Sequence, residues 1–239
     1  MMQVYRRLSS IKALSFDLDD TLYDNHPVIR RVENEMALWL HQHHPISSQL
    51  SSQQWKELKF QLAETHPELK HDVTIWRKTQ IEQGLKQLGY DNLKAKEASE
   101  DGIKHALWLR NQVDVPLESH QTLQALKEKF PLIAITNGNV DVHEIGLGQY
   151  FDLVLKAGPD GRSKPHQDMF LAASHHLGLP NEQILHVGDH LISDVSGAKK
   201  CGFSTCWINT SISPITEHHQ ARVLPDIEID NVSELLYLI

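Results

Sequence analysis

Two different spacings of apolar residues divide the chain. Residues 11–18 form a short apolar run that leads into a polar loop, and LIAITNGN, FDLVLKAG, ILHVGD and STCWIN repeat this pattern after residue 116. Runs of this length are typical of strands, and strands without polar alternation are typical of sheets covered on both faces. Helical spacing predicts helices between them, at residues 117–129, 165–177 and around 195–200. Alternating strands and helices predict an α/β fold with a doubly wound parallel sheet.

Residues 26–112 follow the other spacing. Four apolar residues recur at every fourth position in their first part: Val28, Val32, Met36 and Leu40. This is the period of one helix face, and later runs keep it between proline and glycine breaks. The pattern predicts about four helices and no strand, an α-helical bundle inserted into the α/β fold. The predicted domains are an α/β core, residues 1–24 and 113–239, and a helical insert, residues 25–112.

The composition excludes several classes of partner. The chain has 239 residues, and its formal net charge of -8 offers no basic face to nucleic acid. No stretch reaches the roughly 18 apolar residues of a membrane span, and residues 1–16 contain no signal-peptide core. We therefore expect a cytoplasmic protein that binds neither nucleic acid nor a membrane. Cys201 and Cys206 fit neither a CxxC pair nor a zinc site, and we expect two reduced, partly buried thiols.

Polar residues collect after the predicted strands. The carboxyl ends of parallel strands meet at one edge of a sheet, where such folds bind their ligands. Four separate segments would bring acids, a hydroxyl, an amide and an amine to this edge. These residues are Asp17 and Asp19 after the first strand, Thr136 and Asn137 after LIAI, Lys164 in GRSKP, and Asp189 and Asp194 in GDHLISD.

The first of these segments, FDLDDTLYD, holds four carboxylates within eight positions. While the chain stays extended, Asp17 and Asp19 point to the same side. Carboxylates this close need a hard divalent cation, and Mg²⁺ prefers such oxygen ligands. One aspartate can attack phosphorus to give an aspartyl-phosphate, and the other can transfer protons. Lys164 and Thr136 would balance the charge on the phosphate oxygens.

These motifs resemble those of the haloacid dehalogenase superfamily. FDLDDTL is similar to its DxDxT signature, ITNGN to its Ser/Thr motif, SKP to its lysine motif and GDHLISD to its closing GDxxxxD motif. All four stand in the expected order between residues 11 and 208. A single DxD is common by chance, but the ordered set is specific. The resemblance implies a Mg²⁺-dependent phosphatase whose helical insert is a cap domain.

The resemblance also implies the roles of the acids. Asp17 would be the nucleophile and a Mg²⁺ ligand. Asp19 would be the general acid/base and would bind the metal through its backbone carbonyl. Asp189 would bind Mg²⁺ directly and Asp194 through water. Asp20 matches no catalytic role, and we expect it to shape the turn.

The remaining motif residues would hold the phosphate. Thr136 and Asn137 would contact it, and Lys164 would bridge the nucleophile and the phosphate. His190 stands where many members of the superfamily carry Asp or Ser, so the surroundings of the metal are expected to differ here.

Longer runs point to a narrower group within the superfamily. ALSFDLDDTLYDN, AITNGN, AGPDGRSKP and ILHVGDH resemble bacterial phosphatases of flavin-pathway phosphates. This resemblance implies a small-molecule phosphate monoester as substrate, 5-amino-6-(5-phospho-D-ribitylamino)uracil or FMN. Two alternatives stay open: a broad-specificity sugar-phosphate or nucleotide phosphatase, and a phosphomutase, which shares the whole core. The sequence does not predict the oligomeric state.

Three other classes fit the motifs less well. An EF-hand loop that starts at Asp17 would need Gly at Leu22 and Glu at Val28. A receiver domain, which is not an enzyme, also phosphorylates an aspartate in a doubly wound sheet. It needs neither the long insert nor a GDxxxxD motif this late in the chain. A dehalogenase of the same superfamily needs neither Asp19 nor a metal.

The helical insert also holds four tryptophans: Trp39, Trp55, Trp76 and Trp108. One could stack on a flavin or a pyrimidine. Their helical spacing predicts that most of them pack in the core of the bundle instead.

Overall fold

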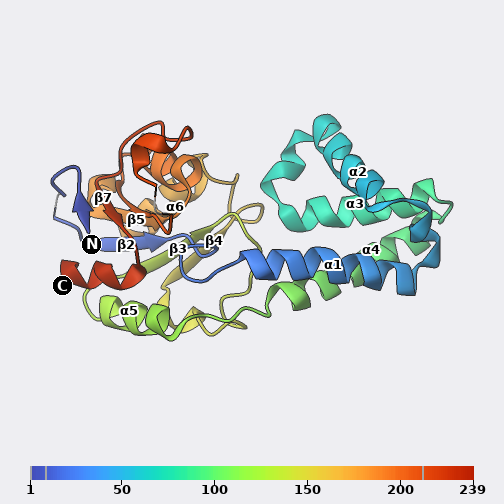
Figure 1. Cartoon of the computed structure of the whole chain (residues 1–239), viewed down its shortest axis with the longest axis horizontal. Coiled ribbons are helices and arrows are strands. Elements are labelled where there is room, and N and C mark those ends of the chain that lie inside the picture. Colours follow the sequence, from blue (N-terminus) through green and yellow to red (C-terminus); the bar gives the residue numbers. More distant parts are fainter. Residues whose placement is uncertain (1, 9, 212) are drawn as a thin grey trace. The chain divides into compact units, whose positions relative to one another are not determined.

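The computed structural model describes residues 2–8, 10–211 and 213–239, which form two compact units (Figure 1). One unit consists of the chain before Asn25 together with Asp114–Ile239, and the other is Asn25–Val113. The first contains the sheet and the second contains only helices among its regular elements.

The first unit is built on a seven-stranded sheet in the order β1-β7-β6-β5-β2-β3-β4. All neighbouring strands are parallel except β1 and β7, which are antiparallel. The strands are β1 (Gln3–Val4), β2 (Ala13–Phe16), β3 (Leu132–Thr136), β4 (Leu153–Lys156), β5 (Ile184–Gly188), β6 (Ser204–Ile208) and β7 (Ile227–Ile229).

The doubly wound α/β fold is confirmed, but the sheet is mixed rather than wholly parallel. The sequence patterns predicted the five strands β2 to β6 and missed the pair at the edge. β1 has two residues and β7 has three, so neither is long enough to show a hydrophobic period. The antiparallel contact joins β1 near the start of the chain to β7 near its end, and no local pattern signals such a pairing.

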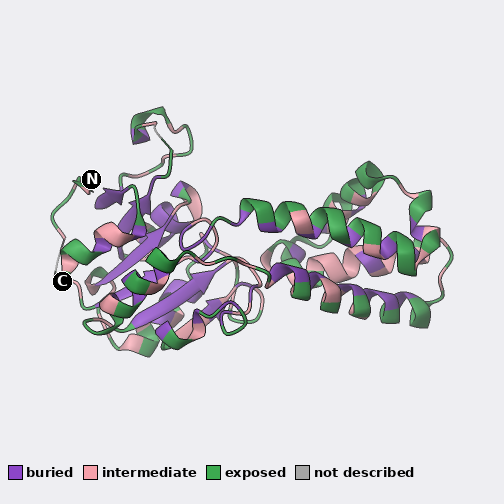
Figure 2. Cartoon of the chain, turned by 60° about the horizontal axis from the view of Figure 1, so that its bottom comes forward, coloured by how far each residue is buried: buried purple, intermediate pink, exposed green. Residues whose placement is uncertain are grey.

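Both faces of the sheet are covered. Residues of β2 alternate between the two faces, and Ala13 packs with Phe170 and Ala173 of α6 (Asp168–Leu177). The opposite face is covered by α5 (Leu117–Lys127), which lies on the other side of the sheet from α6 (Figure 1). Figure 2 shows the central strands as a buried layer. This explains why their sequences are apolar without alternation.

β2 is the strand at which the winding direction changes. From β2 the chain continues to β3 and β4 on one side, whereas β5, β6 and β7 extend the sheet on the other side. In open α/β sheets the carboxyl ends of the strands at such a switch point form the ligand-binding crevice. Asp17 follows β2 directly.

The second unit is a helical bundle with a core of its own. The residues predicted from the four-residue spacing are all buried, and they pack against α3 (Val73–Gln87) and α4 (Asn92–Arg110). Most of the tryptophans were expected in this core, but Trp39 and Trp55 are only partly buried against it and Trp108 is 58% exposed. Gly84 leaves room for Trp55, since a Cβ atom there would lie 2.1 Å from the indole. The helices are α1 (His26–His43), α2 (Ser52–Thr65), α3 (Val73–Gln87) and α4 (Asn92–Arg110).

Two helices of the first unit differ from the sequence prediction. α6 begins at Asp168, three residues after Pro165. The helix expected around residues 195–200 is a π-helix over Leu191–Ser196 followed by α7 (Gly197–Lys200). Both cysteines are free, as predicted. In the described ranges, no helix combines the length and apolar character needed to cross a membrane, and the cytoplasmic location stays a prediction.

Candidate active site

The loop after β2 carries the first two acids. The backbone N–H of Asp17 donates to the carbonyl of Val187, which joins it to β5. Beyond Leu18 the chain turns sharply, and Asp20 takes a φ of 58°, the left-handed conformation that Asp tolerates in turns. This agrees with the predicted role of Asp20. The chain reverses its direction at this turn, and the Asp20 N–H donates to the Tyr23 carbonyl.

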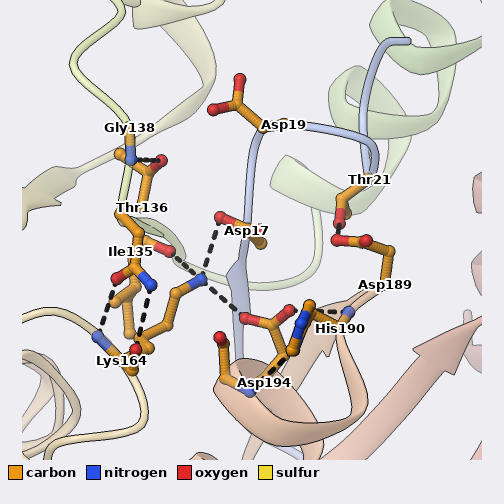
Figure 3. A network of polar contacts seen from close by, with 12 residues as sticks. Asp17, Asp19, Thr21, Ile135, Thr136, Gly138, Lys164, Asp189, His190 and Asp194 are labelled. Atoms are coloured by element: carbon orange, nitrogen blue, oxygen red, sulfur yellow. Dashed lines mark hydrogen bonds and ion pairs between the residues drawn. The ribbon is translucent and has the colours of Figure 1, made fainter. Parts of the chain in front are cut away.

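Three of the predicted acids converge. One carboxylate oxygen from each of Asp17, Asp189 and Asp194 lies within 4.8 Å of the others. They come from the ends of β2 and β5 and from the π-helix after β5. The Asp19 carboxylate is not a member of this cluster. In Figure 3 it points away from the Asp17 carboxylate, so the two do not point to the same side as predicted, because the extended strand ends at Phe16 and the chain turns at Asp20.

Lys164 is the cation at the centre of the cluster. Its ammonium lies 2.9 Å from Asp17 Oδ1 and 2.7 Å from Asp194 Oδ1, and it donates to the carbonyl of Ile135 at 2.6 Å (Figure 3). The side chain is 1% exposed. Burial lowers the pKa of a lysine, but the two aspartates outweigh this effect and raise the pKa of Lys164. Lys164 is therefore a permanently charged neighbour of the nucleophile candidate.

Asp194 is held from three directions. Its Oδ1 accepts from Lys164 and lies 3.2 Å from His186 Nε2, and its Oδ2 accepts from the backbone N–H of His190 at 3.0 Å. Gly188 leaves the space for this carboxylate, because a Cβ atom at that position would lie 2.4 Å from Asp194 Cγ. A glycine is thus required at position 188 because any larger side chain would collide with Asp194.

The two residues of the Ser/Thr motif, Thr136 and Asn137, make hydrogen bonds within the protein. The Thr136 hydroxyl accepts from the N–H of Gly138 at 2.9 Å and is completely buried. The Asn137 side chain binds the backbone of Lys164: its Oδ1 accepts from the Lys164 N–H at 2.7 Å, and its Nδ2 donates to the Lys164 carbonyl at 3.0 Å. We therefore assign Asn137 the additional task of fixing the Lys164 loop. Its contact with phosphate stays a prediction.

Further side chains support the acids. The Tyr23 hydroxyl donates to Asp19 Oδ1 at 2.7 Å, and the Thr21 hydroxyl donates to Asp189 Oδ1 at 3.3 Å. The indole N–H of Trp207, at the end of β6, donates to the Asp189 carbonyl at 2.7 Å.

The charges in the cluster are unbalanced. Burial, with the neighbouring Asp194 and Asp20, raises the pKa of Asp189 to about 7. Burial also raises the pKa of Asp17 well above its usual range, although Lys164 acts in the opposite direction. Burial would raise the pKa of Asp194 too, but Lys164 and His186 hold it below its usual range. Three carboxylates thus share one ammonium, and two of them are costly to ionise without a further cation.

The donor set fits a hard divalent metal ion. All three converging groups offer carboxylate oxygen, which Mg²⁺ prefers over nitrogen or sulfur donors. A doubly charged ion would compensate the excess negative charge. Asp17, Asp189 and Asp194 could therefore hold a metal.

Sequence reasoning did not predict the role of His190 and did not single out several other residues of the site. His190 caps the π-helix, since its Nδ1 accepts from the N–H groups of Ile192 and Ser193. His186, Ser15 and Trp207 lie inside apolar strands, where sequence patterns indicate packing. The signal that could have identified His186 and Ser15 is a polar side chain in a strand that is otherwise apolar on both faces.

Comparison with known proteins identifies the family to which this fold and its acidic cluster belong. The family described as haloacid dehalogenase-like hydrolase matches residues 11–202. The chain belongs to this family, and the predicted superfamily is confirmed.

Individual relatives lie within the same family. The chain is 44% identical to 5-amino-6-(5-phospho-D-ribitylamino)uracil phosphatase YigB of Escherichia coli (strain K12), and the match covers 100% of both chains. Its structure is similar to that of 2-haloacid dehalogenase from Pseudomonas syringae pv. Tomato DC3000, with a TM-score of 0.88 and 34% identity over 95% of this chain and 97% of that one. The magnesium-bound putative HAD-hydrolase YfnB from Bacillus subtilis shares the fold, with a TM-score of 0.61 and 21% identity over 96% and 99% of the two chains.

Proposed function

We propose that this protein is a Mg²⁺-dependent phosphatase that hydrolyses a small-molecule phosphate monoester through a phosphorylated Asp17. The observation that carries the proposal is the meeting of Asp17, Asp189 and Asp194 around the Lys164 ammonium at the switch point of the sheet. Such a set combines a nucleophile, a site for a divalent cation and a fixed positive charge.

Asp17 and Asp19 divide the chemistry between them. The Asp17 carboxylate attacks phosphorus, and the bond from phosphorus to the leaving oxygen breaks. Asp19 gives its proton to that oxygen and later takes one from the water that attacks the aspartyl-phosphate, which regenerates Asp17 and releases phosphate. Asp19 must turn toward the reacting atoms for both transfers, because its carboxylate points away from Asp17 in the structure (Figure 3).

The remaining residues bind and orient the phosphoryl group. Lys164 stabilises the charge that develops on its oxygens, and the buried Thr136 hydroxyl offers a donor beside it. Mg²⁺, held by Asp17, Asp189, Asp194 and the Asp19 carbonyl, would neutralise charge on the phosphoryl group when bound. Residues 25–112 act as the cap of this core and exclude water from the reaction.

The substrate we propose is 5-amino-6-(5-phospho-D-ribitylamino)uracil, with FMN as a second substrate of the same kind. Full-length identity of 44% to the E. coli phosphatase of that name supports the first. Both molecules carry a phosphate on a ribityl chain attached to a heterocycle, so one recognition mode can serve them.

Dehalogenation is the second candidate, because of the likeness to the P. syringae protein. The cluster argues against it. Attack on a carbon–halogen bond creates no trianionic phosphoryl group and so needs neither three converging acids nor a divalent cation. A phosphomutase would use the same core. It differs from a phosphatase only in that the phosphoryl group passes from the aspartyl-phosphate to a substrate hydroxyl and not to water.

The deciding experiment measures phosphate and halide release by the full-length protein. The panel contains the ribitylaminouracil phosphate, FMN, p-nitrophenyl phosphate, sugar phosphates, nucleotides and 2-chloropropionate. We expect phosphate release that stops with EDTA and in Asp17→Asn, and the highest kcat/KM for the two ribityl phosphates. Halide release, or phosphate release that survives in Asp17→Asn, contradicts the mechanism.

A matched control separates the site from the fold. Asp101 is exposed on α4 and pairs with Lys104, so Asp101→Asn removes the same charge outside the acidic cluster. This variant keeps wild-type activity. Equal turnover of the whole panel by the wild type would leave a phosphatase but remove the flavin-pathway substrate.

A further inference from the structure

The middle of the sheet contains a buried polar pair that the proposed reaction does not use. Ser15 in β2 and His186 in β5 are direct neighbours across the parallel pair of strands. Ser15 is 0% exposed and His186 is 1% exposed. Their side chains lie on the α6 face, where the imidazole packs edge-on against Phe170 at 5.0 Å between ring centres. An apolar pair would suit this position if packing were the only requirement.

The two side chains connect the sheet to the acidic cluster. Ser15 Oγ lies 2.9 Å from His186 Nδ1, and His186 Nε2 lies 3.2 Å from Asp194 Oδ1. The same Asp194 oxygen accepts from Lys164, whose ammonium reaches Asp17. A continuous series of polar contacts therefore runs from the centre of the sheet to the proposed nucleophile.

The surroundings select one form of the imidazole. The ring is buried and shares Asp194 Oδ1 with the Lys164 ammonium. A charged imidazolium would place a second cation beside Lys164 at one carboxylate oxygen. In the neutral ring one nitrogen donates and the other accepts. Asp194 can only accept, so Nε2 carries the hydrogen and Nδ1 accepts from the Ser15 hydroxyl.

We propose that Ser15 and His186 are positioning residues that hold Asp194 in the orientation needed by both the metal cluster and Lys164. Ser15 fixes the tautomer of His186, and the Nε2–H of His186 fixes Asp194 Oδ1. This inference rests on the proposed function for its consequences in catalysis. Metal-binding side chains are commonly held in place by hydrogen bonds from residues that do not touch the metal. The loss of such a residue typically costs about 10- to 100-fold in metal affinity or activity. Ser15 and His186 support Asp194 in this way.

The tautomer can be measured in the wild-type protein. Long-range ¹H–¹⁵N NMR of the imidazole rings, with the His186 signals assigned by their loss in His186→Gln, distinguishes the two neutral forms and the imidazolium. We expect the Nε2–H form in the wild type. An Nδ1–H or doubly protonated ring contradicts the proposal, whatever the activity of the protein.

The functional consequence is measured with three variants. His186→Leu keeps an apolar side chain against Phe170 and removes the donor to Asp194. His186→Gln places an amide nitrogen near the former Nε2, and Ser15→Ala removes the hydroxyl that fixes the tautomer. The readouts are the Kd of Mg²⁺ by calorimetry on the substrate-free protein, and kcat and KM with p-nitrophenyl phosphate.

We expect His186→Leu to weaken Mg²⁺ binding about tenfold or more and to lower kcat with little change in KM. His186→Gln recovers most of both losses, and Ser15→Ala lies between wild type and His186→Leu. Wild-type Mg²⁺ affinity and kcat in His186→Leu, or equal defects in the Gln and Leu variants, would overturn the proposal. If His186→Leu does not fold, Ser15→Ala with wild-type Mg²⁺ affinity overturns it equally.

Thr205 supplies the matched control. It is the neighbour of His186 on β6, is 0% exposed, and its hydroxyl contacts Asp226 instead of His186. Thr205→Val therefore removes a buried hydroxyl from the same row of the sheet without touching Asp194, and Mg²⁺ affinity is expected to stay at the wild-type value. A wild type that neither binds Mg²⁺ nor releases phosphate refutes the proposed function. A functional wild type with an unaffected His186→Leu refutes only the inference.

Discussion

The Tyr23 hydroxyl donates a hydrogen bond of 2.7 Å to Asp19 Oδ1, four residues earlier in the same loop. The tight turn at Asp20 makes the contact possible, because the Asp20 N–H donates to the Tyr23 carbonyl and brings the two ends of the loop together. The Tyr23 ring is buried, and the buried Ser119 hydroxyl holds the loop from α5 through the Leu22 carbonyl. This bond holds the Asp19 carboxylate in the orientation that points away from Asp17, so Asp19 must leave Tyr23 to reach the leaving oxygen.

Tyr23→Phe should ease proton transfer to the leaving group, because Asp19 no longer has to break this hydrogen bond to turn toward the reacting atoms. A ribityl oxygen needs a proton to leave, whereas p-nitrophenolate leaves without one. We expect kcat/KM for FMN to rise about tenfold, the effect of one hydrogen bond to a charged group, and kcat/KM for p-nitrophenyl phosphate to change little. Steady-state kinetics with both substrates measures the difference.

Tyr5→Phe is the control for this variant. The Tyr5 hydroxyl also donates to a carboxylate, Glu228 Oε2 at 2.6 Å, but at the β1–β7 edge of the sheet. It should leave both rates unchanged. Equal changes in kcat/KM for the two substrates in Tyr23→Phe, or a loss with FMN alone, would mean that Tyr23 does not hold Asp19 in its resting orientation.

Gly188→Ala should displace Asp194. The new Cβ atom would lie 2.4 Å from Asp194 Cγ, and the crowded carboxylate cannot keep its contacts with Lys164 and the His190 N–H. We expect loss of Mg²⁺ binding, measured by calorimetry, and of phosphatase activity. Gly178→Ala is the control: it has open space but a positive φ of 62°, so it should lower the free energy of unfolding by about 1 kcal/mol without a change in activity.

Lys164→Met should destabilise the protein as well as inactivate it. Asp194, 1% exposed, would lose its cation, and breaking one side of a buried ion pair costs about 3–5 kcal/mol. Urea unfolding measures this loss. Adding Asp194→Asn removes the uncompensated charge and should restore much of the stability but no activity. An equally unstable double variant would show that Lys164 contributes through packing rather than through charge.

The stabilisation by Mg²⁺ should increase with pH. The pKa of Asp189 is raised by burial to about 7 from 3.8, so the folded metal-free protein holds a proton between these values that the unfolded chain releases. Its stability therefore falls as pH rises through this window. Mg²⁺ binds the ionised carboxylate, and the increase in melting temperature on adding Mg²⁺ should be larger near pH 8 than near pH 6.

Two variants separate this effect from other pH-dependent groups. Asp189→Asn should make the Mg²⁺ shift smaller and less dependent on pH, and the raised pKa of Asp17 accounts for the dependence that remains. Asp168→Asn should leave it unchanged, because the hydrogen bond from Arg162 lowers the pKa of Asp168 to about 2, outside this range. A Mg²⁺ shift that is the same at both pH values in the wild type contradicts the assignment of Asp189 to the metal cluster.

The sequence by itself determined the central strands, the helical insert and the residues that meet at the switch point. Apolar runs at strand length and apolar residues every fourth position are local signals, and the ends of parallel strands meet by topology alone. The convergence of Asp17, Asp189 and Asp194 therefore follows from their positions after the predicted strands. The short edge strands could not be predicted in this way, because β1 and β7 pair across almost the whole chain and are too short for a period.

Only the tertiary structure decided how the site is held. Asn137 lies next to Thr136 in the chain, yet its side chain binds the backbone of Lys164, 27 residues later. His186 is one polar residue in an apolar strand, and its contacts with Ser15 and Asp194 exist only once β5 lies beside β2. Hydrogen bonds are directional and short, so they depend on side-chain placement that no spacing along the sequence encodes. Motifs name the reacting groups, and packing sets where their atoms point.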